Sequence, residues 1–165
     1  MWFVDNVLPL IRVRVPEARL AIVGSNPPQA VLELAGDAIT VSANVSDDVL
    51  RQHYQTARVA AVPLRYGAGV KLKVVEAMRE GLPLVTTPIG AQGLPELGSI
   101  VPVCDQPQGF ADAICRLLTD DVVWVEQSAA EVDYVAARYS ERAFRTALIG
   151  AIDQPASRCA ARRAS

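Results

Sequence analysis

The sequence predicts an α/β domain: a doubly wound, mostly parallel sheet of about five strands, closed by a helical C-terminal segment. Two observations predict this class. Short apolar runs alternate with helical patterns over the first part of the chain, whereas only helical patterns follow residue 107. Within residues 59–87, a buried-strand pattern, a glycine loop, a helix pattern and a second strand pattern follow one another. Such a βαβ unit has parallel strands, and its helix lies across a face of the sheet.

The composition is that of one soluble globular domain, with 165 residues, of which 51% are hydrophobic and 21% charged. A chain of this length buries a core without metals or disulfides. The net charge of -2 argues against nucleic-acid binding. No apolar run approaches the roughly 20 residues that span a bilayer. Asp5 and Asn6 follow the first apolar residues too soon for a signal peptide. We therefore expect a cytoplasmic domain without a membrane segment.

The cysteines and the single histidine do not predict a metal site. Cys104, Cys115 and Cys159 show no CxxC spacing and, being three, cannot all pair internally. We expect free thiols in a reducing cytosol. His53 lies in a helical pattern and is expected on the surface or half buried. A Ser-His-Asp triad or a histidine-rich metal site would need more than this chain offers.

The elements before the central βαβ unit are short. Apolar residues at helical spacing predict one amphipathic helix over residues 2–14, despite Pro9. Ser46 is a good N-cap, because Asp47 and Asp48 follow it in the first helical turn. The expected elements are that helix, a strand at 19–23, a helix at 29–35, a strand at 39–41 and a helix from 47 to about 56.

The second half holds the central unit and then a run of helices. Pro102 places the last expected strand at a sheet edge, because proline has no N–H for the ladder. The expected elements are strand 59–64, loop 66–69, helix 70–80, strand 84–87, loop 88–94, strand 100–103 and helices 108–118, 122–138 and 141–152, the last capped by Ser140. We expect one domain over residues 1–153. The tail at 154–165 has no apolar face and should be disordered.

The loop at residues 66–69 is a candidate anion site. It opens at the carboxyl end of a strand and the amino end of a helix, where unpaired N–H groups and the helix dipole favour an anion. Gly67 and Gly69 would let a ligand approach the backbone, and Lys71 and Lys73 add positive charge. A single glycine loop is also compatible with a plain βα turn. Both interpretations remain open at this point.

Three stretches around this loop resemble a known family. They are GAGVKLKVVEAM at residues 67–78, GLPLVTT at 81–87 and GAQGL at 90–94. Together they resemble the nucleotide-sugar-binding half of retaining GT-B glycosyltransferases of the group 1, or family 4, type. PEARLAIVG at residues 16–24 and the βα pattern at 42–59 agree with this resemblance, which covers about residues 5–150. It implies that the domain is the Rossmann-like, C-terminal half of a GT-B fold.

The resemblance also implies roles for particular residues. Glu76, the glutamate before Ala-Met, would accept hydrogen bonds from the ribose hydroxyls of a nucleotide. The alternative is an ordinary solvent-facing helix glutamate. The expected donor site comprises Asn44 and Val45 beside the base, Gly67, Gly69, Val70, Lys71 and Leu72 at the diphosphate, Glu76 at the ribose, and Gly90 with the loop to Leu94 across the cleft. The backbone amides of residues 69–72 would hold the diphosphate.

The sequence departs from the family pattern in three ways. Many members carry a sugar-contacting glutamate where this chain has Ala68, so Lys71 or Lys73 would act as the charge partner of the diphosphate. Family members begin this domain with a strand and a loop whose Arg and Lys grip the diphosphate, and both are missing here. The N-terminal acceptor-binding domain is missing as well. We therefore expect the isolated chain to be inactive.

The leading interpretation is the donor-binding part of a retaining hexosyltransferase, of the kind used in polysaccharide biosynthesis. It would move a hexose from a UDP- or GDP-sugar to a glycan or lipid-linked acceptor, with no metal or other cofactor required. Catalysis would rest on positioning and on stabilising the departing diphosphate. The full-length enzyme could lie peripherally at the inner membrane, and the missing acceptor domain would be its partner.

A second interpretation belongs to a different class. A truncated, non-catalytic α/β module could form a homodimer through an exposed sheet edge. The feature that favours it is the start of the chain inside a helix, where Trp2 and Phe3 lack an obvious partner. A dinucleotide-dependent oxidoreductase is a poor third option, since Gly24-Ser25-Asn26-Pro27 cannot serve as the GxGxxG fingerprint.

Overall fold

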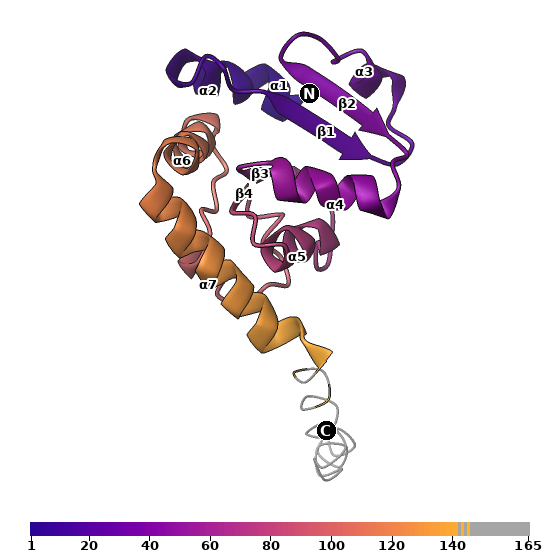
Figure 1. Cartoon of the computed structure of the whole chain (residues 1–165). Coiled ribbons are helices and arrows are strands. Elements are labelled where there is room, and N and C mark those ends of the chain that lie inside the picture. The colour runs from indigo at the N-terminus through magenta and orange to yellow at the C-terminus, as the bar shows by residue number, and fades with distance from the viewer. Residues whose placement is uncertain (142, 144, 146–165) are drawn as a thin grey trace, which may run out of the picture.

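The computed structural model describes residues 1–141, 143 and 145 (Figure 1). The elements are α1 (Trp2–Asn6), α2 (Leu8–Arg14), β1 (Leu20–Gly24), α3 (Gln29–Leu32), β2 (Ile39–Ala43), α4 (Asp47–Thr56), β3 (Ala60–Val62), α5 (Leu72–Arg79), β4 (Leu84–Thr86), η1 (Leu97–Ser99), α6 (Pro107–Thr119) and α7 (Asp121–Tyr139). The predicted α/β class and its helical C-terminal segment are confirmed. Figure 1 shows the β1–β2 pair at one end of the molecule and α7 running along α6 and α5. No helix in the described part of the chain is both long and apolar enough to cross a membrane.

The strands are parallel, as predicted, but they form two pairs. β1 pairs with β2 from Leu20 opposite Ile39, and β3 pairs with β4 from Ala60 opposite Leu84. The predicted strand at 100–103 is reduced to one bridge between Val103 and Thr86. Its Pro102 accepts a hydrogen bond from the amide of Thr86 and has no N–H to extend the ladder. The described residues therefore contain four strands in two sheets, which differs from one sheet of about five.

The N-terminal helix is broken into α1 and α2 at Val7. Pro9 stands in the first turn of α2, where its missing N–H costs no hydrogen bond, whereas a continuous helix would force its ring against a carbonyl. The expectation that Trp2 and Phe3 lack a partner is wrong. Their rings pack edge-to-face on Phe110 of α6, with centroids 5.9 and 5.8 Å away. Residues more than a hundred positions apart thus form this part of the core.

Local signals placed most helix ends correctly. The Ser46 hydroxyl accepts a hydrogen bond from the Val49 amide, so the predicted cap of α4 is confirmed. Gly81, at φ 70°, follows the end of α5, which lies at Arg79, within one residue of the predicted end at 80. The Ser140 hydroxyl accepts from the Ala143 amide at 3.2 Å, which agrees with the predicted cap. The rest of the helix expected at 141–152, the tail at 154–165 and Cys159 lie outside the described residues.

Side chains of α7 complete the hydrogen bonding at the start of β4. The Leu84 amide donates to Glu131 Oε1 at 3.0 Å, and Gln127 Nε2 donates to the Leu84 carbonyl at 2.9 Å. These two side chains occupy the place of a neighbouring strand. Glu131 is fully buried, and burial raises the pKa of its carboxyl group to about 7. These hydrogen bonds from α7 fix the start of β4, which leads into the second glycine loop.

Candidate functional site

The first glycine loop presents a row of backbone donors. Gly67 and Gly69 have φ of 125° and 74°, values that favour glycine, and they turn the chain into α5. Lys71 is the N-cap of that helix, so α5 begins at Leu72 and not at Val70 as predicted. Within residues 1–141, no hydrogen-bond acceptor takes the amides of residues 69–72. Four consecutive amides without an acceptor therefore run from the loop into the first residue of α5, where unpaired N–H groups favour an anion.

The structure distinguishes the two lysines that the sequence left equivalent. Lys71 is half buried, and its ammonium group donates to the carbonyls of Ala68 and Gly69 at 2.7 and 2.9 Å. Lys73 is exposed and makes no hydrogen bond or ion pair with the residues that the structure describes. The charge of Lys71 therefore lies inside the loop itself. Lys73 lies two residues further along, so the two side chains do not share a face of the helix.

The second glycine loop touches the first. A Cβ placed on Gly93 would lie 2.8 Å from the Cγ2 of Val70, and Gly93 has φ 77°. A Cβ on Gly90 would lie 1.9 Å from the Thr86 hydroxyl, so only glycine fits there. The buried Thr87 hydroxyl donates to the Leu64 carbonyl and accepts from the Gly90 amide. The ends of β3 and β4 and both loops are thereby held together.

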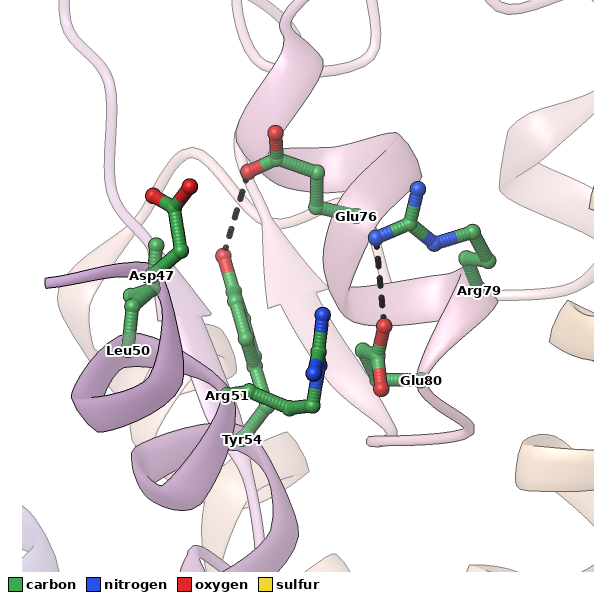
Figure 2. A pocket seen from close by; sticks show the side chains of 7 residues that line it. All are labelled: Asp47, Leu50, Arg51, Tyr54, Glu76, Arg79 and Glu80. Carbon is green, nitrogen blue, oxygen red and sulfur yellow. Dashed lines mark hydrogen bonds and ion pairs between the residues drawn. The ribbon is translucent and has the colours of Figure 1, made fainter.

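Glu76 faces a pocket between α4 and α5 (Figure 2). Its Oε2 accepts a hydrogen bond from the Tyr54 hydroxyl at 3.4 Å, and its side chain is half buried. Because α5 begins at Leu72, Glu76 lies about one turn into the helix. The pocket has a volume of about 240 Å³ and is lined by Asp47, Leu50, Arg51, Tyr54, Glu76, Arg79 and Glu80.

Charges of both signs line this pocket. Figure 2 shows Arg79 paired with Glu80, at 3.1 Å, on the far side from Asp47. Arg51 lies 3.8 Å from Asp48 on its own helix. Burial raises the pKa of Tyr54, and the neighbouring Glu76 carboxylate raises it further, so its hydroxyl stays protonated at neutral pH. A polar ligand with several hydroxyl or N–H groups would find acceptors on both helices.

Sequence reasoning missed the α4 side of this pocket. Asp47, Leu50, Arg51 and Tyr54 recur at helical spacing, which was the available signal that they share one face. This spacing does not show that these residues face α5. Glu76 is the one predicted site residue among those lining the pocket. The predicted loop residues Gly67, Gly69, Val70, Lys71, Leu72 and Gly90 do not line it.

The residues predicted beside the base have a structural role in this chain. Asn44 has φ 53°, and its Oδ1 accepts a hydrogen bond from the Asn26 amide at 2.9 Å. This contact joins the turns after β1 and β2. Val45 is half buried immediately before the Ser46 cap, and neither Asn44 nor Val45 lines the pocket. The side chain of Asn44 is thus already engaged.

The other reactive side chains lie apart from the pocket. Cys104 is half buried and Cys115 is buried; both are free thiols, and burial raises the pKa of each. His53 is half buried on α4, as predicted. In the described part of the chain, no cluster of three or more His, Cys, Asp or Glu side chains could hold a metal ion.

The amino-acid sequence is similar to those of known proteins. Residues 1–120 match the glycosyl transferases group 1 family. A GDP-mannose-dependent alpha-(1-6)-phosphatidylinositol monomannoside mannosyltransferase of Mycobacterium tuberculosis is 33% identical over 151 residues, covering 81% of this chain and 39% of that protein. An uncharacterized 44.6 kDa protein in the cps region of Klebsiella pneumoniae is 31% identical over 100 residues, covering 56% of this chain and 26% of that protein. This chain therefore spans well under half the length of these curated relatives. Because the family match includes the βαβ unit, both glycine loops and the pocket, the chain belongs to the group 1 glycosyl transferases.

Proposed function

We propose that this chain is the donor-binding, C-terminal half of a retaining GT-B glycosyltransferase that moves a hexose from a nucleotide-sugar to a glycan or lipid-linked acceptor. One observation carries the proposal: four free amides at residues 69–72 lead into α5, and Glu76 follows about one helical turn after Leu72, the first residue of that helix. The amides suit a diphosphate, and the carboxylate suits the vicinal diol of a ribose. A nucleoside diphosphate contains both groups.

The spacing within α5 supports this assignment. Leu72 and Glu76 stand four residues apart and so lie on the same face of the helix. Four residues correspond to about 6 Å of helix rise, so the phosphate and sugar parts of one nucleotide can reach both groups. On binding, the ammonium of Lys71 would exchange its bonds with the carbonyls of residues 68 and 69 for phosphate oxygens. That charge and the helix N-terminus would then stabilise the departing diphosphate.

The pocket favours guanine over uracil as the base. Asp47 stands at the start of α4 and lines the same pocket as Glu76. Its carboxylate can accept two hydrogen bonds from the N1–H and N2–H₂ groups on one edge of guanine, whereas uracil offers one ring N–H. A relative that matches most of this chain is described as GDP-mannose-dependent. We therefore infer a GDP-sugar as the donor.

The chain supplies part of a larger site. Its pocket of about 240 Å³ is smaller than the roughly 300–1,000 Å³ typical of small-molecule sites. We infer that the acceptor and the remaining contacts to the donor come from an N-terminal domain, in keeping with the greater length of the relatives. The isolated chain would then bind GDP weakly and transfer no sugar. We propose a cytoplasmic enzyme that needs no metal at the donor.

The proposal is tested by nucleotide affinity. Calorimetric titration of GDP, UDP and ADP into the chain should give millimolar or tighter binding of GDP and weaker binding of the other two. Glu76→Ala should weaken GDP binding about tenfold, the factor expected for lost charge-assisted hydrogen bonds. Glu33→Ala, at an exposed glutamate beyond the end of α3, is the matched control and should change nothing. Absence of GDP binding by the wild-type chain would contradict the proposal.

The structure removes the observation that favoured a self-associating module. That interpretation rested on Trp2 and Phe3 having no partner, and both rings pack against Phe110. We do not retain it as a second candidate.

A further inference from the structure

We propose that Tyr54 is a positioning residue for the nucleotide: its hydroxyl holds one oxygen of Glu76 so that the other faces the ribose diol. This inference rests on the proposed function, since it assigns Glu76 to a ribose. It adds a residue on α4 to a site otherwise built from the glycine loops and α5. The two side chains meet across the groove between the helices, as Figure 2 shows.

Among the described residues, Tyr54 is the one hydrogen-bond partner of the Glu76 carboxylate. The hydroxyl lies 3.4 Å from Oε2, which is long for a bond between these groups, typically about 2.7–2.8 Å. A carboxylate left to solvent would sample several rotamers, and a bound diol would have to select one. A donor already in place removes part of that cost.

The other donors in the pocket make no hydrogen bond to Glu76. Arg79 pairs with Glu80 at 3.1 Å, and Arg51 lies 3.8 Å from Asp48. A phenol also leaves the negative charge of the carboxylate intact, because it is neutral. Glu76 therefore keeps its full strength as an acceptor for the two ribose hydroxyls.

Tyr54 is itself held in place. Its ring is half buried and packs against the apolar cluster formed by β3, β4, α5 and α7. A ring with two rotatable bonds that packs on a core has few alternative positions. The cluster thus fixes the ring, the hydroxyl fixes the carboxylate, and the carboxylate orients the sugar.

The test compares GDP with 2′,3′-dideoxy-GDP, which lacks the diol and keeps the base and diphosphate. The wild-type chain should bind GDP about tenfold more tightly than the dideoxy compound. Tyr54→Phe should reduce this ratio severalfold by weakening GDP binding, with the affinity for dideoxy-GDP unchanged. In a Glu76→Ala background, Tyr54→Phe should have no further effect on either affinity. Circular dichroism verifies that each variant is folded.

Tyr134→Phe is the matched control. It removes a hydroxyl that donates to the Pro95 carbonyl at 2.8 Å, far along the chain from the pocket residues. It should leave the GDP to dideoxy-GDP ratio at the wild-type value, even where it lowers stability. A wild-type chain that does not bind GDP, or binds both compounds equally, would overturn the proposed function and this inference with it. A wild-type preference for GDP that survives Tyr54→Phe would overturn the role of Tyr54 alone.

Discussion

Gly93 and Val70 are in direct contact across the two glycine loops. The backbone of Gly93 approaches so closely that a Cβ there would lie 2.8 Å from Val70 Cγ2 and 3.4 Å from the Val70 amide nitrogen. That amide is one of the four free donors at the start of α5. The second loop therefore packs against the first, although it comes more than twenty residues later in the chain.

Gly93→Ala should displace the first loop. The substitution adds a Cβ at φ 77°, which costs about 1–2 kcal/mol for an L-residue, and it pushes on Val70. We expect lower stability together with weaker GDP binding, measured by thermal unfolding and by titration. Gly98→Ala is the control, because its Cβ would meet its nearest neighbour at an ordinary 3.8 Å. Unchanged GDP affinity in a folded Gly93→Ala variant would contradict the coupling of the two loops.

Replacing the two lysines should separate their roles. Lys71→Met removes the charge that lies inside the loop and should weaken GDP binding about tenfold, with a smaller effect on GMP. Lys73→Met removes an exposed charge and should change GDP affinity less than twofold, roughly as expected for a solvated side chain. Titrations at low and at moderate salt make the comparison. Equal losses in the two variants would show that only the overall charge matters.

The stability of the chain should depend on pH through Glu131. Burial raises its pKa from 4.5 to about 7, so the folded state holds the proton more tightly than the unfolded state. The contribution of this group to the free energy of unfolding is therefore full below pH 4.5 and declines as pH rises to about 7. The total change is about 3 kcal/mol. Glu131→Gln should flatten this slope in urea unfolding at successive pH values.

Glu126→Gln is the matched control on the same helix, since Glu126 is exposed. It should leave the pH profile of the wild-type chain in place. The assignment of the slope to Glu131 would be wrong if Glu131→Gln kept the same decline between pH 4.5 and 7.

Asp47 should set the choice of base. Asp47→Ala removes the proposed acceptor for guanine, so the preference for GDP over UDP should fall about tenfold, largely through weaker GDP binding. Asp48→Ala is the control, because Asp48 is the adjacent exposed carboxylate and does not line the pocket. A preference for GDP that persists in Asp47→Ala would mean that another group reads the base.

Local chemistry determined which elements could be predicted from the sequence. The cap at Ser46 and the end of α5 at Gly81 depend on a few neighbouring residues, and both predictions are confirmed. The contact of Trp2 with Phe110 joins residues more than a hundred positions apart, which periodicity does not detect. Predicting a strand at 100–103 failed because Pro102 cannot continue the ladder beyond the single bridge at Val103.

In the candidate site, too, residues close together in the sequence could be predicted, whereas contacts between distant segments could not. Glu76 and the glycine loop are contiguous in sequence and were predicted from it. Tyr54 and Asp47 belong to another helix, and only the packing of α4 against α5 brings them to Glu76. The sequence did not show which lysine lies in the loop. The shape of the loop, which depends on Gly67 and Gly69, decides that the Lys71 side chain folds into it. Asn44 and Val45 were placed beside the base by resemblance, whereas the Asn44 amide oxygen binds Asn26.

Residue-resolved binding tests the central claim most directly. GDP titrated into the isotope-labelled chain should shift the backbone amide signals of residues 69–72 together with those around Tyr54 and Glu76. Guanosine, which lacks phosphate, should shift only the second group, because the four free amides are assigned to the diphosphate. If millimolar GDP moves neither group, or moves signals elsewhere in the chain, the donor site is not where the two glycine loops meet α5.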